Sequence, residues 1–139
     1  MQETVPDDRR KAPKLRVLIV DDDVRVRRAL RGLIQCSPDL AVVGEAGSTR
    51  SAKRLDLELL PDVVVLDLLL PQAPQGMQVL RELRGRGRPV VAICGTGVLG
   101  PQAVRAGAYA FLDKHGRDVD DLLEMIRADH QHDPWPRGG

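Results

Sequence analysis

Short apolar runs alternate along the chain with longer stretches in which apolar residues recur every three or four positions. Most of the runs are rich in Val, Leu and Ile and nearly continuous, which is typical of parallel strands covered on both faces. They lie at residues 15–20, 40–46, 62–70, 89–94 and 108–112. We expect each run to form a strand.

The stretches between the runs have the period of amphipathic helices. The clearest apolar stripe comprises Val26, Ala29, Leu30, Leu33 and Ile34. Further stripes lie at 52–59, 79–83 and 119–126, with a weaker helical signal at 101–106. Strands that alternate with helices predict a doubly wound α/β fold with a parallel sheet and right-handed crossovers. In such sheets ligands bind outside the carboxyl ends of the strands.

Polar residues mark the ends and the outer faces of these helices. Asp23 and Ser48 precede helical stripes and are candidate N-caps, and Pro61 closes the second stripe. Two groups of arginines lack the interleaved aromatic residues that stack on nucleic acid, so we interpret them as solvated faces. They are Arg25, Arg27, Arg28 and Arg31, and Arg81, Arg84, Arg86 and Arg88.

Composition narrows the class of protein. The 139 residues suffice for one domain, and its core must be aliphatic because only 2% of the residues are aromatic. A net charge of +1 gives little attraction to nucleic acid or to an anionic membrane. No apolar run reaches the ~18 residues of a membrane span, and no apolar signal segment opens the chain. Two cysteines are too few for a disulfide framework.

These observations predict a cytoplasmic protein that binds neither nucleic acid nor a membrane. We expect a flexible arm at 1–14, one domain at 15–130, and a tail or the start of a linker at 131–139.

Carboxylates gather at the predicted carboxyl ends of the strands. The first strand runs into Asp21, Asp22 and Asp23, and Asp67 interrupts the apolar run of the third. The fifth strand ends at Lys114. Acids that meet at one edge repel one another, and a hard cation such as Mg²⁺, which prefers oxygen ligands, relieves that repulsion. Lys114, at the end of the fifth strand, would then pair with an anion bound to the metal. Carboxylates, a hard cation and a lysine together indicate a site for a phosphoryl group.

The segment from residue 15 to about 128 resembles the receiver domain of bacterial two-component response regulators. The resemblance rests on VLIVDDD at the first strand, PDVVVLDLLLP around the third and AGAYAFLDK at the fifth. It implies a flavodoxin-like fold of five strands in the order 2-1-3-4-5, with a short or irregular fourth helix. It also implies phosphotransfer from a histidine kinase to an aspartate.

The resemblance assigns roles to four residues around the acidic cluster. Asp67 matches the phosphoacceptor. Asp21 and Asp22 match the acidic pair that organises Mg²⁺, Asp22 directly and Asp21 chiefly through water. The backbone carbonyl of Leu69, two residues past the acceptor, matches a metal ligand.

The resemblance also covers the switch, where the chain departs from the family. Lys114 matches the lysine that pairs with the acceptor and the phosphoryl oxygen, and Phe111 matches the aromatic that rotates on activation. The usual Thr or Ser after the fourth strand falls on Cys94, with Thr96 two residues further on. The register places the switch position at Cys94, and Thr96 would take it if the strand ends later. The segment from Cys94 to Lys114 is about two residues shorter than is usual in the family.

We therefore expect a phospho-accepting signalling domain that is not itself an enzyme. Its implied partners are a sensor histidine kinase or phosphotransfer protein, a downstream protein target, and a second copy through the strand-four to helix-five face. The alternative is a receiver-like interaction module that works without phosphorylation, which Cys94 and the short loop favour. A third hypothesis is a phosphohydrolase of the haloacid dehalogenase type, in which Asp21 and Asp23 form the D-x-D pair.

Overall fold

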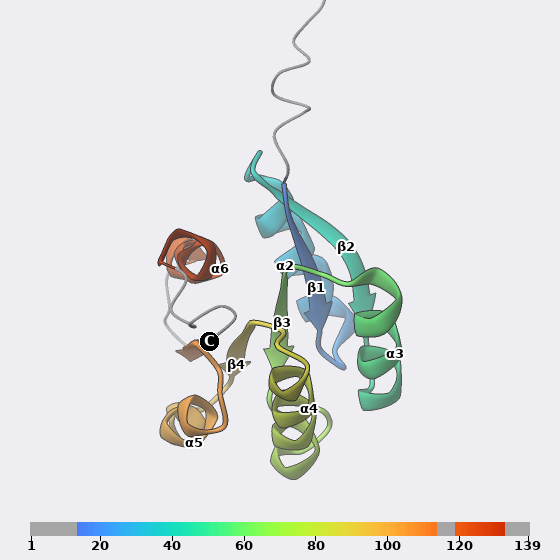
Figure 1. Cartoon of the computed structure of the whole chain (residues 1–139), viewed down its shortest axis with the longest axis vertical. Helices are drawn as coiled ribbons and strands as arrows, with labels where there is room; N and C mark the ends of the chain where they lie inside the picture. The colour runs from blue at the N-terminus through green and yellow to red at the C-terminus, as the bar shows by residue number, and fades with distance from the viewer. Residues whose placement is uncertain (1–13, 114–118, 133–139) are drawn as a thin grey trace, which may run out of the picture.

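A five-stranded parallel sheet forms the centre of the molecule, in the order β2-β1-β3-β4-β5 (Figure 1). The computed structural model describes residues 14–113 and 119–132. The strands are β1 (Leu15–Val20), β2 (Leu40–Ala46), β3 (Val63–Asp67), β4 (Val90–Cys94) and β5 (Ala110–Asp113). The predicted fold class and strand order are confirmed.

Helices cover both faces of the sheet. They are α2 (Val24–Gln35), α3 (Thr49–Leu59), α4 (Ala73–Gly85), α5 (Gly100–Arg105) and α6 (Val119–His132), with a 3₁₀ turn, η2, at Gly97–Leu99. One core cluster joins the sheet to α2 and α6 through Ile34, Leu122 and Ile126. The other joins it to α3, α4 and α5, for example through Ala52 and Leu80. No helix in the described part of the chain has the length and apolar character needed to cross a bilayer.

The third strand is shorter than the apolar run at 62–70 predicts. β3 ends at Asp67, and the amide of Leu69 donates a hydrogen bond to Asp67 Oδ1 at 3.0 Å, which turns the chain away from the sheet. Leu68 and Leu70 remain fully buried beyond the strand. The apolar run therefore indicates that the residues before and after Asp67 are buried, and it does not give the length of the strand.

One weakly predicted helix is confirmed, and another helix is longer than predicted. The weak fourth helix is present but short, as predicted, and follows η2 at the end of β4. The last helix continues to His132, although the sequence after about residue 128 has no apolar period. The residues of the final turn show no apolar period, so periodicity does not detect this turn.

A buried ion-pair cluster ties α3 to the segment that leads into β4. Asp56 is fully buried on α3 and accepts hydrogen bonds from Arg88 Nε at 2.6 Å and Arg86 Nη1 at 2.9 Å. Arg88 also donates to the carbonyl of Pro61 at 2.9 Å. The interpretation of these two arginines as a solvated face is wrong, because a buried carboxylate must be paired.

A second ion pair fastens α6 to the loop before β2. Arg127 donates to Asp39 at 2.8 Å and to the hydroxyl of Ser37 at 2.6 Å. The hydrogen bond from Arg127 holds the pKa of Asp39 below its usual value. This contact joins α6 to the loop that follows α2, the helix with which α6 shares a core cluster.

Candidate functional site

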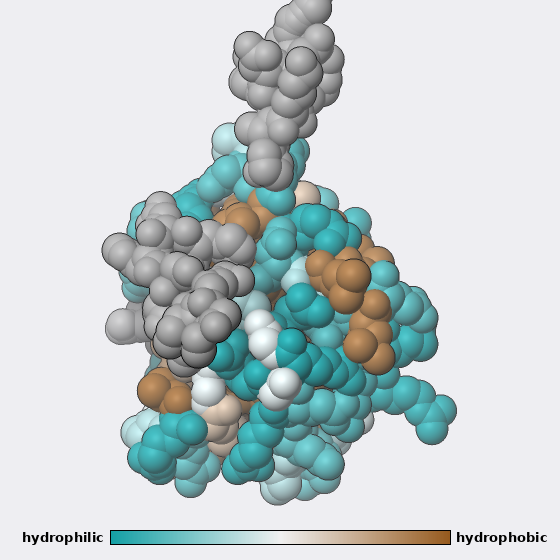
Figure 2. Space-filling model, viewed as in Figure 1, coloured by the Kyte–Doolittle hydropathy of each residue, from teal (hydrophilic) through white to brown (hydrophobic). Residues whose placement is uncertain are grey.

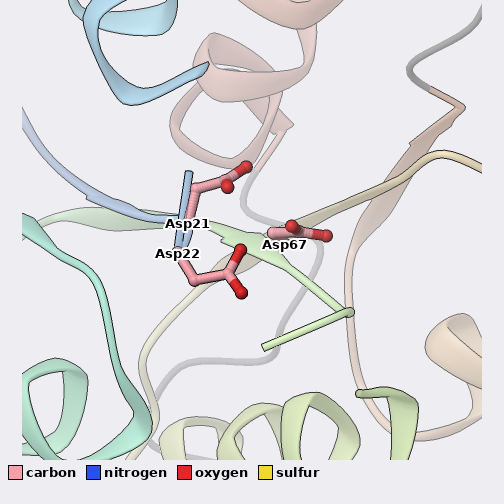
Figure 3. A group of neighbouring side chains, drawn as sticks. All are labelled: Asp21, Asp22 and Asp67. Atoms are coloured by element: carbon pink, nitrogen blue, oxygen red, sulfur yellow. The ribbon is translucent and has the colours of Figure 1, made fainter. Parts of the chain in front are cut away.

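Three carboxylates converge at the carboxyl ends of β1 and β3 (Figure 3). Asp21, Asp22 and Asp67 each offer an oxygen, and these oxygens all lie within 4.8 Å of one another. Asp21 and Asp67 are buried, whereas Asp22 is exposed. β1 and β3 are paired neighbours in the sheet, which places their two acidic ends side by side.

The backbone holds two of these carboxylates in place. Asp21 Oδ1 accepts a hydrogen bond from the amide of Asp23 at 2.9 Å. Asp67 Oδ1 accepts from the amide of Leu69, and the amide of Leu68 donates to Ile93 at 2.9 Å. The turn after β3 is therefore connected both to the Asp67 side chain and to β4.

Asp23 does not join the cluster. Its side chain accepts from the amide of Arg25 at 2.9 Å and caps α2, as predicted, and this backbone hydrogen bond lowers the pKa of Asp23. The acidic group comprises Asp21, Asp22 and Asp67 instead. The D-x-D pairing of Asp21 with Asp23, on which the haloacid dehalogenase hypothesis depends, is not formed.

Arg27 is a positioning residue that the sequence pattern did not reveal. Its Nη1 donates to the backbone carbonyl of Asp21 at 2.6 Å, and its Nε pairs with Glu45 at 3.2 Å. Arg31 pairs with the same glutamate at 2.6 Å. The interpretation of Arg27 as solvated is wrong, since only 19% of its side chain is exposed. Its one sequence signal is its position on the first turn after the acidic run.

The two candidate switch residues lie at and just after the end of β4. Ile93 pairs with Asp67 across the sheet, so Cys94 stands one residue beyond the partner of Asp67. Cys94 is buried at the last position of β4. Thr96 is exposed, and its hydroxyl accepts from the amide of Val98 at 3.3 Å, which caps η2.

Three predicted site residues remain, and the structure describes two of them. Phe111 is half-buried on β5, and a Cβ at Gly100 would lie 3.1 Å from its ring, so α5 rests directly against it. Leu69 follows Asp67 by two residues, and its side chain is partly exposed. Lys114 lies outside the described residues.

The donor set fits a hard divalent cation. The clustered side chains offer carboxylate oxygens only, the ligand type that Mg²⁺ prefers, and the exposed Asp22 leaves one side open to water. Mg²⁺ usually keeps several waters and takes one or two protein carboxylates. Asp21, Asp22, Asp67 and the Leu69 carbonyl would suffice to hold it.

A parallel 2-1-3-4-5 sheet with an acidic cluster at the carboxyl ends of its first and third strands defines a flavodoxin-like receiver fold. The family model of the response regulator receiver domain matches residues 17–127. The chain belongs to this family, as its resemblance implied.

Relatives and solved structures agree with this assignment. The response regulator domain of CheB from Thermotoga maritima superposes with a TM-score of 0.75 at 28% identity, covering 87% of this chain and 99% of that one. A LuxR-family response regulator from Aurantimonas sp. gives a TM-score of 0.76 at 34% identity, covering 83% and 84%. A protein-glutamate methylesterase/protein-glutamine glutaminase from Dechloromonas aromatica is 37% identical over 83% of this chain and 36% of its own length.

The prediction that the chain is not itself an enzyme is contradicted by its relatives. Several relatives are named as enzymes, including the one from Dechloromonas aromatica and another from Rhodopseudomonas palustris that is 39% identical. The matched region covers 80% of this chain and 32% of the Rhodopseudomonas protein, so this chain spans about a third of such relatives. The shared part is the receiver domain.

Proposed function

We propose that the chain accepts a phosphoryl group on Asp67 from a sensor histidine kinase or a phosphotransfer protein. The observation that carries this proposal is the convergence of Asp21, Asp22 and Asp67 within 4.8 Å at the sheet edge of a receiver domain. Asp67 is the only acid of the three that stands in an otherwise apolar strand.

The chain's own residues support an in-line transfer. One oxygen of Asp67 forms a bond to phosphorus while the bond from phosphorus to the donor's imidazole nitrogen breaks, and the electron pair stays on that nitrogen. Because the amide of Leu69 donates to Oδ1 of Asp67, that side chain is held in one orientation for the attack. Asp21 and Asp22 would hold Mg²⁺, which neutralises charge on the phosphoryl oxygens. We assign to Lys114 the pairing with a phosphoryl oxygen.

The product is an aspartyl phosphate that shifts the population of two conformations. The face that responds is the region from the end of β4 to α6, which carries Cys94, Phe111 and the short helix α5. A downstream protein that binds one of the two conformations better would receive the signal.

Intact mass spectrometry tests the proposal directly. After incubation with a small-molecule acyl phosphate and Mg²⁺, we expect one added phosphoryl group that hydroxylamine removes. Asp67→Asn should abolish the mass increase, whereas Asp120→Asn, an exposed acid at the start of α6, should leave it unchanged. Equal labelling of Asp67→Asn would reject Asp67 as the acceptor. A wild-type chain that is never labelled but still binds its target would support the phosphorylation-independent module instead.

A further inference from the structure

The charge of the chain is unevenly distributed. Between residues 68 and 112 there are five arginines and a single acid, Glu82, although the whole chain has 21 basic and 20 acidic residues. Glu82 is engaged on the side of α3, where it pairs with Lys53 at 3.1 Å and with Arg86 at 2.7 Å. The opposite side of α4, which faces α5, therefore carries positive charge without a compensating acid from either helix.

A cleft between α4 and α5 concentrates this charge. It has a volume of about 320 Å³, and its described lining consists of Met77, Arg81, Gln102, Arg105 and Ala106. Arg81 projects from α4 and Arg105 from the last turn of α5, and both are exposed. Neither arginine forms an ion pair with any residue that the structure describes. Figure 2 shows that the surface over α4 is mostly hydrophilic.

We propose that the α4–α5 cleft binds a small dianion through its phosphate or carboxylate oxygens. Guanidinium groups match both oxyanions with paired hydrogen bonds, and Arg81 and Arg105 offer one such group from each wall. The Gln102 amide supplies a further donor. The cleft's volume lies at the lower end of the range for small-molecule sites. Its described lining has no aromatic residue on which a nucleobase could stack, which favours a small anion over nucleic acid.

The position of the cleft gives such an anion a structural effect. α5 is a helix of six residues whose first residue, Gly100, lies against the ring of Phe111. An anion bound by both arginines would link α5 to α4 and restrict movement of α5 relative to β5. The site uses none of the acidic residues of the phosphoacceptor cluster, so it stands independently of the proposed function.

Titration of the ¹⁵N-labelled full chain tests the proposal. Inorganic phosphate and succinate are added separately at constant ionic strength without Mg²⁺, with acetate as the monoanion control. We expect saturable amide shifts in α4 and α5 that are stronger for a dianion than for acetate. The variant Arg81→Gln/Arg105→Gln should weaken binding at least about tenfold, because it removes both charge-assisted contacts. Arg28→Gln, which removes an exposed arginine of α2 that has no ion pair among the described residues, should bind like the wild type.

The arms of the experiment separate the possible ligands. Saturable binding of phosphate alone identifies a phosphate ester as the ligand class, binding of succinate alone identifies a dicarboxylate, and binding of both identifies general recognition of dianions. The proposal is overturned if the double Gln variant binds as the wild type does, if the shifts centre on Asp67 rather than on the two helices, or if no dianion gives saturable shifts.

Discussion

The three clustered acids differ in their access to solvent. Asp21 is fully buried and Asp67 is 4% exposed, whereas Asp22 faces water. A buried carboxylate is costly unless hydrogen bonds or a cation compensate it, and backbone amides already serve Asp21 and Asp67. A hydrated cation would therefore approach the three carboxylates from the side on which Asp22 is exposed.

The predicted switch position offers either a thiol or a hydroxyl. Cys94 is buried one residue beyond the β4 partner of Asp67, and a thiol is a weak hydrogen-bond donor, while the hydroxyl of Thr96 caps η2 in an exposed position. We expect Cys94→Thr to enlarge the phosphorylation-induced amide shifts in α5 and β5, because a charge-assisted hydrogen bond worth about 1.5–3 kcal/mol becomes available. Thr96→Ala should have little effect. If Thr96→Ala instead weakens the response while Cys94→Thr is neutral, Thr96 holds the switch role.

Individual residues were predictable where a sheet rule governs them. The meeting of Asp21, Asp22 and Asp67 follows because the carboxyl ends of parallel strands share one edge. The role of Arg27 was not predictable, since a helical arginine among other arginines reads as solvent-facing. Its contact with the Asp21 carbonyl depends on how α2 is tilted against β1, which no local pattern contains.

At the scale of elements, α4 begins with a close approach to the turn after β3. A Cβ at Gly76 would overlap the backbone carbonyl of Leu68, the residue after Asp67. Gly76→Ala should therefore lower the free energy of unfolding by more than about 2 kcal/mol, because the helix must move away from the site. Gly85→Ala, at the end of the same helix, meets nothing within 4 Å and should be neutral or stabilising by up to about 1 kcal/mol. Urea unfolding of both variants measures the difference, and equal stabilities would contradict the packing argument.

The buried ion pairs of Asp56 lie near the starts of β3 and β4, at the end of the sheet away from the three clustered carboxylates. Removing one partner of a buried ion pair typically costs about 3–5 kcal/mol, and Asp56 is fully buried between Arg86 and Arg88. Since the two arginines are 24% and 18% exposed, we expect Asp56→Ala to cost about 3 kcal/mol, at the lower end of that range. Glu58→Ala removes an exposed pair with Arg54 on the same helix and should change stability by less than about 0.5 kcal/mol. Chemical unfolding that shows the same small change for both variants would refute a structural role for Asp56.

Elements were predictable to the extent that their residues are apolar. α3 follows its expected cap, because Ser48 and Ser51 form a capping box. α4 begins six residues before its predicted stripe at 79–83, since its first turns are polar or contain Pro74 and contribute no period. Burial patterns detect the face of a helix that contacts the sheet, and they miss turns whose boundaries are set by Pro and Gly chemistry.

At the scale of the whole molecule, periodicity indicated a doubly wound parallel sheet, but the order 2-1-3-4-5 came from the family resemblance. Most of the strands are nearly continuous runs of apolar residues, so the pattern does not say which strands are neighbours or which lie at the edge. Strand order nevertheless decides the site, because it makes β1 and β3 adjacent and brings their acids together.

Because of that adjacency, we expect the stability of the whole domain to respond to Mg²⁺. Three carboxylates within 4.8 Å repel one another, so Mg²⁺ that binds only the folded state should raise Tm. At a concentration tenfold above Kd the gain is about 1.4 kcal/mol, or roughly 5 °C for a domain of this size. Asp22→Ala should abolish this gain and raise Tm without Mg²⁺, since it removes one of the repelling charges. Glu58→Ala, whose carboxylate is remote from the cluster, should keep the full Mg²⁺ response in the same calorimetric scan. A Mg²⁺ response that persists in Asp22→Ala would place the cation elsewhere on the molecule.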